Sequence, residues 1–165
     1  MSDDAVASDA AAIGDADAAA RAEADAANSR AATFIAKFMG AVPHLKTLGI
    51  AYRAHGDGWA ELELPYAPHL IVDDGVIASG AIFSLMDSAA GFAVFTRLKS
   101  LVGHATIDLR LDYPRGPVPG VTIIARAICY RITSSIAFVR GFAHQGDPAV
   151  PIANMAGTFI HGGVA

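Results

Sequence analysis

The chain has 165 residues, of which 53% are hydrophobic and 17% are charged, and its formal net charge is −4. This length suits a single domain with a sizeable core, and the acidic balance argues against a protein that binds nucleic acid. The one cysteine, Cys129, excludes a disulfide framework and a cysteine-based zinc site, and it is compatible with a reducing compartment such as the cytoplasm.

The first thirty residues differ in composition from the rest of the chain. They hold seven acidic residues and two arginines, a balance of −5, whereas the remainder has a balance of +1. Thirteen of the first 29 residues are alanine, and so few large apolar side chains cannot offset the entropy lost on ordering. We therefore expect residues 1–28 to form a separate tail, disordered to about Asp15 and helical from Ala16, and residues 29–165 to form one domain. The acidic start, with no apolar segment behind it, is unlike a secretory signal peptide.

An extra N-terminal helix is expected to follow the tail and to end at Gly40 and Pro43. The apolar residues before this end repeat at helical spacing, so the helix is expected to dock on the domain. These residues are Ala32, Phe34, Ile35, Phe38 and Met39.

Strands are predicted on both sides of a long apolar segment. Two short runs, 50–53 and 59–64, flank the hairpin signal H-G-D-G at 55–58, and the proline-containing residues 65–76 are interpreted as a loop. Later runs are separated by short turns, which predicts antiparallel neighbours; they are residues 121–132, 135–144 and 149–161.

A further strand is predicted at 104–113, where apolar and polar residues alternate. Its apolar face is expected to hold Ala105, Ile107, Leu109, Leu111 and Tyr113. Its polar face is expected to hold His104, Thr106, Asp108, Arg110 and Asp112.

Between the two groups of strands, Val76 to Phe95 are twenty residues with a single charge, that of Asp87. This length and composition also suit a transmembrane helix. However, the segment contains several serines and glycines, and no basic cluster flanks it. Because the amphipathic strands need an apolar element to cover, we expect a helix buried in the domain and no membrane span.

The two faces of this helix differ at 100° per residue. The face opposite Asp87 is large and apolar and is expected to pack on a sheet; it holds Ile82, Leu85, Ala89 and Phe92. The side of Asp87 is small and polar and lets a ligand approach closely; it holds Gly80, Ser84, Gly91 and Val94. A partly desolvated carboxylate there suits general-base or nucleophilic chemistry. The alternative is a structural Asp87 that accepts backbone N–H groups.

Two segments resemble the hotdog-fold thioesterases of the phenylacetyl-CoA thioesterase (PaaI) type: G-V-I-A-S-G-A-I-F-S-L-M-D-S-A-A-G (75–91) and A-T-I-D-L-R-L-D-Y-P-R-G (105–116). In that family the central helix reads roughly G-x-x-H-G-G-x-x-x-x-L-x-D-x-x-x-G, and the next strand reads roughly T/S-x-D-L-x-x-x-Y-x-R-P. The order of elements agrees over residues 45–162. The resemblance implies an α+β hotdog fold, in which a curved antiparallel sheet wraps a long central helix, assembled as a homodimer or homotetramer.

The resemblance also implies an acyl-CoA thioesterase that binds its substrate between two protomers. No cofactor is expected, since coenzyme A is part of the substrate. Asp87 matches the family carboxylate that activates water or attacks the thioester carbonyl. Thr106 matches a Ser or Thr of the partner's strand that helps to place the water. The helix start, at Ser79 and Gly80, would hold the oxyanion with its free N–H groups and its dipole.

Other residues are candidate substrate contacts. In related proteins the turn that matches Ser134 and Ser135 touches the pantetheine arm, and Arg115 lies where a basic residue could meet the phosphates of CoA. Ser84 shares the side of Asp87, and His69 could supply a polar group that the family carries in the preceding loop.

The chain departs from the family at the start of the helix, where H-G-G reads Ala78-Ser79-Gly80. Ser79 either donates its hydroxyl to the substrate carbonyl or caps the helix. Two functions therefore stay open, a catalytic thioesterase and a non-catalytic module that binds acyl-CoA or another hydrophobic ligand. No metal site is expected, because the six histidines form neither H-x-x-x-H nor H-E-x-x-H.

Overall fold

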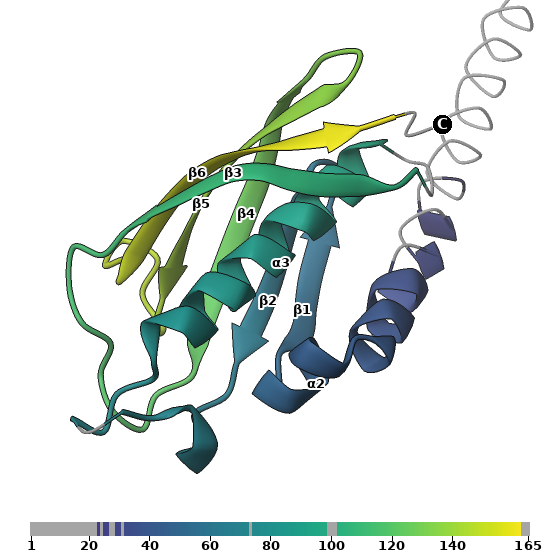
Figure 1. Ribbon diagram of the computed structural model, residues 1–165. Coiled ribbons are helices and arrows are strands. Elements are labelled where there is room, and N and C mark those ends of the chain that lie inside the picture. The colour runs from purple at the N-terminus through teal and green to yellow at the C-terminus, as the bar shows by residue number, and fades with distance from the viewer. Residues whose placement is uncertain are drawn as a thin grey trace, which may run out of the picture.

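The computed structural model describes residues 23, 25, 26, 29, 30, 32–72, 74–98 and 102–162. A six-stranded antiparallel sheet wraps the long helix α3 (Ser79–Leu98), with the strands in the order β1-β2-β4-β5-β6-β3 (Figure 1). The strands are β1 (Ala51–Gly56), β2 (Trp59–Leu64), β3 (His104–Asp112), β4 (Ile123–Ile132), β5 (Ile136–His144) and β6 (Ala153–His161). The predicted α+β hotdog fold is confirmed. Most of the predicted tail lies outside the described residues.

The central helix is buried because the sheet covers its apolar face. The face predicted to pack on the sheet is buried, as expected for Ile82, Leu85 and Ala89. Phe92 is also buried, but its ring contacts Phe38 of the N-terminal helix. Cys129, in the middle of β4, is 3% exposed and packs in the same core. By length and composition alone α3 could also span a membrane, but most of its apolar stretch is buried inside the protein.

Helix α3 begins three residues later than the predicted Val76. The preceding segment folds back on itself, since the N–H of Val72 donates to the carbonyl of Val76 at 3.0 Å and Gly75 adopts a φ of 74°. The N–H of Ala78 donates to the carbonyl of Leu70 at 2.8 Å, which keeps the residues before Ser79 extended. The apolar run continues through this turn, so composition alone does not show where the helix starts, whereas the family resemblance placed the start at Ser79 and Gly80, where α3 begins.

Strand β3 does not keep the predicted alternation, because a β-bulge interrupts it. The register against β6 shifts between Thr106 and Asp108, leaving Ile107 as the extra residue. Thr106 is paired with the buried Phe159 of β6, whereas Ile107 is 56% exposed. The prediction that Ile107 lies on the apolar, core-facing side was therefore wrong.

Turns determine where strands β1, β2 and β6 begin or end. The predicted hairpin between β1 and β2 is confirmed, and Gly58 supplies its positive φ of 74°. Strand β6 begins at Ala153, later than the predicted residue 149, because a turn occupies the intervening residues. In this turn the N–H of Ala149 donates to Oδ1 of Asp147 at 2.9 Å.

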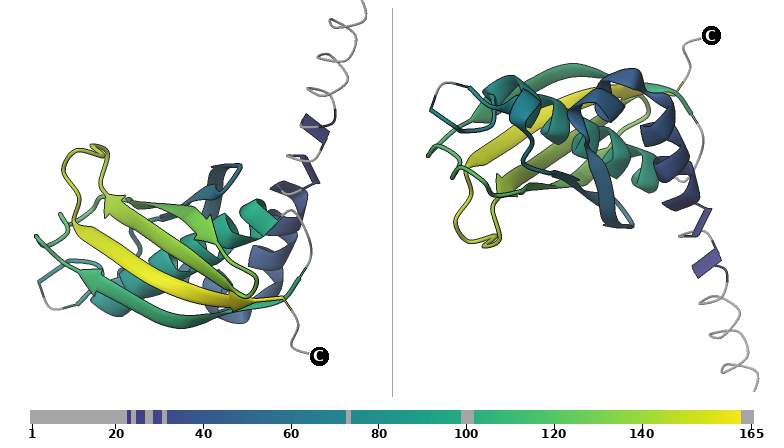
Figure 2. Two further views of the ribbon diagram at one scale, coloured as in Figure 1. Left: turned by 90° about the horizontal axis from the view of Figure 1, so that it is seen from above. Right: turned by 90° about the horizontal axis from the view of Figure 1, so that it is seen from below.

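The N-terminal helix packs across α3 and ends near the predicted position (Figure 2). Its described apolar stretch is Ala32–Ala41, and a short helix, α2 (Pro43–Leu48), follows it. Sequence analysis missed α2, although its signals are present: Pro43 opens its first turn and Gly49, with a φ of 72°, ends it.

Candidate active site

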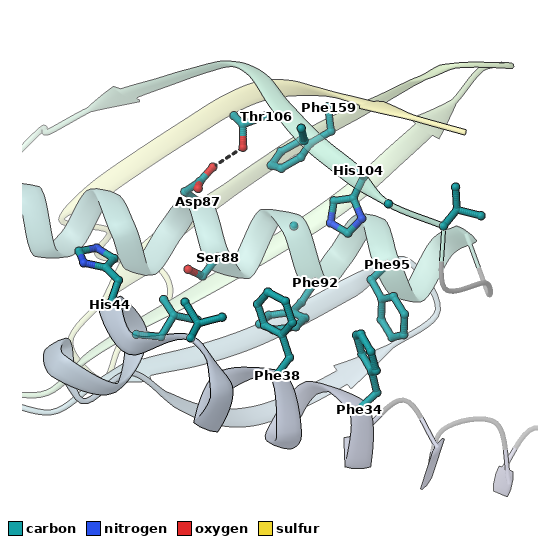
Figure 3. A pocket seen from close by; sticks show the side chains of 16 residues that line it. Phe34, Phe38, His44, Asp87, Ser88, Phe92, Phe95, His104, Thr106 and Phe159 are labelled. Atoms are coloured by element: carbon teal, nitrogen blue, oxygen red, sulfur yellow. Dashed lines mark hydrogen bonds between the residues drawn. The ribbon is translucent and has the colours of Figure 1, made fainter. Parts of the chain in front are cut away.

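A pocket of about 450 Å³ lies between α3, the N-terminal helix and the beginning of β3 (Figure 3). Most of its lining is apolar, and five of its side chains are phenylalanines. The lining residues are Phe34, Phe38, Val42, His44, Leu45, Asp87, Ser88, Gly91, Phe92, Phe95, Val102, Gly103, His104, Ala105, Thr106 and Phe159. The volume falls within the range of about 300–1,000 Å³ that is typical of small-molecule sites.

Asp87 lies on the wall of this pocket, half-buried, and is held by one hydrogen bond. The hydroxyl Oγ1 of Thr106 donates to Oδ1 of Asp87 at 2.8 Å (Figure 3). No hydrogen bond from the described residues reaches the second oxygen, Oδ2. The arrangement thus fixes the carboxylate while leaving one oxygen available to accept a proton. The structural alternative, with backbone N–H groups on Asp87, finds no such contact in the described part of the chain.

The β-bulge is what brings Thr106 to Asp87. Before the bulge, His104 and Thr106 face α3; beyond it, the half-buried Leu109 and Leu111 pack against the core. The strand thereby presents a polar end to the pocket and an apolar end to the rest of the helix. The resemblance implied that this hydroxyl comes from a partner's strand, but Thr106 already bonds to Asp87 within one chain.

His104 is a pocket residue that the sequence analysis placed only on a polar strand face. Its imidazole packs over Gly91 of α3, where a Cβ would lie 3.4 Å from Nε2. Burial lowers the pKa of His104, and the nearby His161 lowers it further, whereas the backbone at Val102 and Gly91 and the charge of Asp87 act in the opposite direction. The buried Nδ1 has no hydrogen-bond partner among the described residues.

Ser84 lies one turn before the Asp87 region and is joined to the pocket through His44. Nε2 of His44 lies 3.0 Å from Oγ of Ser84, and this hydroxyl donates to the carbonyl of Gly80 at 3.1 Å. Since the hydroxyl proton is used on Gly80, the imidazole is the donor to Ser84. Ser84 therefore positions His44 at the rim of the pocket.

The predicted oxyanion residues lie far from Asp87 within one chain. Ser79 and Gly80 open α3 and are exposed, two helical turns from Asp87, which corresponds to about 12 Å along the axis. The alternative role of Ser79 as helix cap was wrong. The carbonyl of Ala78 accepts the first helical bonds, from Ala81 at 3.0 Å and Ile82 at 3.3 Å, so Ala78 is the cap residue.

The other candidate contacts lie away from this pocket. Nε2 of His69 contacts the carbonyl of Thr47 at 2.8 Å, which ties the loop to α2. Arg115 is exposed in the connection that follows β3. Ser134 and Ser135 are exposed in the turn between β4 and β5, where the carbonyl of Ser135 accepts the N–H of His161. Their proposed contacts with CoA stay predictions.

Sequence reasoning found Asp87 and Thr106 but missed the aromatic wall. The relevant signal was the spacing of Phe34 and Phe38, one turn apart on the N-terminal helix, which had been interpreted only as a docking stripe. Over the described ranges, no group of three or more His, Cys, Asp or Glu side chains is arranged to hold a metal ion. The groups available for a reaction are the carboxylate of Asp87, the hydroxyl of Thr106 and the imidazole of His104, which lie beside an apolar cavity.

Comparisons with known proteins agree with this architecture. The sequence profile of the thioesterase superfamily matches residues 74–152, which include Asp87 and Thr106. A protein from Pseudomonas aeruginosa of known structure is 35% identical, with a TM-score of 0.72, over 81% of this chain and 98% of its own. A second conserved protein from Pseudomonas aeruginosa is 29% identical, with a TM-score of 0.68, over 73% of this chain and 94% of its own.

The fold is also that of the PaaI protein from the phenylacetic acid degradation operon of E. coli. This protein is 17% identical, with a TM-score of 0.73, over 82% of this chain and 96% of its own. No curated protein matches the sequence.

Proposed function

The chain belongs to the thioesterase superfamily, and on this premise we propose that it hydrolyses acyl-CoA thioesters with Asp87 as general base or nucleophile. The observation that carries the proposal is the carboxylate of Asp87, held by Thr106 at 2.8 Å on the wall of an apolar pocket. A carboxylate beside an apolar cavity meets the two needs of the reaction, a site for the acyl group and a base for water.

In the proposed reaction, Oδ2 of Asp87 takes a proton from a water molecule whose oxygen attacks the thioester carbonyl carbon. Thr106 holds Oδ1 and so keeps Oδ2 aimed at the water. The carbon–sulfur bond then breaks, CoA leaves as the thiolate, and the acyl group leaves as a carboxylic acid. If Asp87 acts as nucleophile instead, its oxygen forms an anhydride with the acyl group, which water then hydrolyses. Neither route needs a cofactor beyond the CoA of the substrate.

A second protomer would supply the oxyanion donors. The exposed N–H groups at Ser79 and Gly80 lie about 12 Å from Asp87 along α3, too far to act on the same carbonyl. A two-fold axis that sets two copies of α3 antiparallel would bring each helix start to the partner's carboxylate. Strand β3 supports such pairing, because it lies at an edge of the sheet. We therefore propose a homodimer, or a tetramer built from two dimers.

The remaining contacts belong to the same proposal. Ser134 and Ser135 would meet the pantetheine arm, and Arg115 would meet the phosphates of CoA. The cytoplasmic location predicted from the single cysteine stays a prediction. A second candidate function is that of a binding module, which holds acyl-CoA or another apolar ligand without cleaving it. One observation favours it, because Ala78 stands where the family carries histidine.

Replacing Asp87 by asparagine tests the catalytic proposal. Asparagine keeps an oxygen that accepts from Thr106 but cannot take a proton, so CoA release should fall by about 10²–10⁴-fold. The thiol released from aliphatic and aromatic acyl-CoAs is followed with a coloured thiol reagent. Glu63→Gln is the matched control, since it removes a carboxylate from an exposed ion pair on β2 and should leave the rate unchanged.

An Asp87→Asn variant as active as the wild type would refute the assignment. Wild-type protein that binds acyl-CoAs but releases no CoA from any of them would establish the binding module instead.

A further inference from the structure

Two residues of the N-terminal helix, Phe34 and Phe38, cover the pocket and are called its roof below. The opposite wall carries Asp87 on α3. Phe34 and Phe38 of the N-terminal helix face α3 across the cavity (Figure 3). The ring of Phe34 stacks on that of Phe95, with centroids 4.5 Å apart and planes 21° apart. The ring of Phe38 meets that of Phe92 edge-on, at 5.6 Å and 89°. Aromatic pairs of this kind fix the helix at a defined height above α3.

Different residues of the N-terminal helix anchor it to the core and line the pocket. Ile35 and Met39 are 0% and 6% exposed and hold the helix on the core. Phe38 is 45% exposed and contributes to the pocket with its inner edge. Its side chain can therefore change in size while Ile35, Met39 and the stacked pair of Phe34 and Phe95 still hold the helix in place.

The roof lies outside the segment that matches the sequence profile of the thioesterase superfamily. Phe34 and Phe38 precede residues 74–152, the segment that matches the thioesterase superfamily. The carboxylate of Asp87 and the hydroxyl of Thr106 lie inside the matched segment.

The cavity continues from Asp87 along α3. Phe92 and Phe95 follow Asp87 by five and eight residues, which places them about 7 and 12 Å further along the helix axis. A thioester carbonyl at Asp87 would thus leave its acyl chain in the space beneath Phe38 and Phe34. The pantetheine arm does not suit this space, because its amide groups would lose hydrogen bonds to water among phenyl rings.

We propose that the N-terminal helix sets the length of acyl chain that the site accepts, with Phe38 and Phe34 as specificity-determining residues. The inference rests on the proposed thioesterase function and adds the substrate class, an uncharged apolar acyl group whose size is limited by the roof. Phe38 limits the chain from above, and the stacked pair of Phe34 and Phe95 closes the far end.

Two substitutions of opposite size test the inference in the full chain. The kcat/KM values of butanoyl-, hexanoyl-, octanoyl-, decanoyl- and lauroyl-CoA are measured for the wild type, Phe38→Ala and Phe38→Trp. In Phe38→Ala the preference should shift to longer chains, by about tenfold in relative kcat/KM for each methylene that gains room. In Phe38→Trp it should shift to shorter chains. Tyr130→Ala, which removes an aromatic ring 53% exposed on β4, is the control and should keep the wild-type profile.

The test separates this inference from the proposed function. If the wild type releases no CoA from any chain, the proposed function fails, and the same panel is measured for binding by titration calorimetry. A shift of the preferred chain length with the size of residue 38, in hydrolysis or in binding, supports the roof. Identical profiles in the wild type and both Phe38 variants overturn it, even where hydrolysis is robust.

Discussion

Replacing Thr106 by valine removes one interaction from the site while keeping the shape of the side chain. Valine has a methyl group where threonine has the hydroxyl that donates to Oδ1 of Asp87 at 2.8 Å. A hydrogen bond to a charged group contributes about 1.5–3 kcal/mol. If that energy serves to orient the base in the transition state, kcat should fall by about 10- to 150-fold.

The Michaelis constant separates this positioning role from a role in binding. Because the hydroxyl acts on Asp87 and not on the acyl group, KM should change by less than about threefold. Thr106 is exposed and valine is favoured in strands, so the free energy of unfolding should fall by no more than about 1.5–3 kcal/mol, the contribution of the lost hydrogen bond. Thr106→Ser keeps the hydroxyl and should retain most of the turnover. Initial rates of CoA release over a range of substrate concentrations give both constants.

A Thr106→Val variant with wild-type kcat would refute the reasoning, because Asp87 would then need no partner to be productive. The double variant with Asp87→Asn adds a second check. Once the base is absent, loss of the hydroxyl should cost nothing further. Additive losses in the double variant would mean that Thr106 acts on the water or the substrate independently of Asp87.

Two predictions concern stability. Burial lowers the pKa values of His104 and His144, so protonation is less favourable in the folded chain than in the unfolded one. The two neutral imidazoles therefore contribute fully to stability above the ordinary pKa of 6.5, and this contribution is lost as the pH falls below that value. The urea concentration at the midpoint of unfolding should decrease when the pH is lowered from about 7.5 to about 5.5. Equal midpoints at the two pH values would contradict this. Gly157→Ala should destabilise the fold by about 1–3 kcal/mol, because its Cβ would lie 2.6 Å from the carbonyl oxygen of Asp108. Gly116→Ala, whose Cβ would meet nothing within 4 Å, is the control, and equal unfolding energies for the two variants would reject the steric argument.

The resemblance to the family predicted the fold class, and local patterns in the sequence were enough to single out the candidate carboxylate, Asp87. A charge that stands alone in an apolar helix has few arrangements that satisfy it, which is why Asp87 could be singled out. The packing face of α3 was found for a related reason, since helical periodicity fixes which residues share a side. Thr106 came from the family motif, since the alternation pattern put it on the face opposite Leu109 and Leu111, whereas the bulge turns it toward α3 as well.

The errors arose where a single residue changes the geometry of its neighbours. Ile107 continues the alternation of β3 in sequence, yet it is the extra residue of a bulge that only pairing with β6 reveals. Val76 continues the apolar run of the helix, yet a turn at Gly75 keeps it out. The bulge has no local signature, because it depends on which strand lies alongside. The turn does have one, since its prolines and glycine predicted a loop over residues 65–76.

The pocket shows the same limit on a larger scale. Phe34 and Phe38 precede Asp87 by about fifty residues, and no periodicity connects them. Their contact with Phe92 and Phe95 exists only because the N-terminal helix folds back over α3. The carboxylate could be predicted, whereas the cavity beside it could not.

The distance between Asp87 and the start of α3 suggests why pairing of two chains would matter for this site. The core of one chain is already complete, with the sheet wrapped around α3 and the N-terminal helix packed on it. Among the described residues, the predicted oxyanion donors at the exposed start of α3 lie two turns away from the Asp87 of the same chain. Pairing of two chains would therefore mainly supply oxyanion donors to the site, and the burial of further apolar surface would be secondary. Each protomer would bring its own base and acyl pocket and borrow only the helix start of its partner.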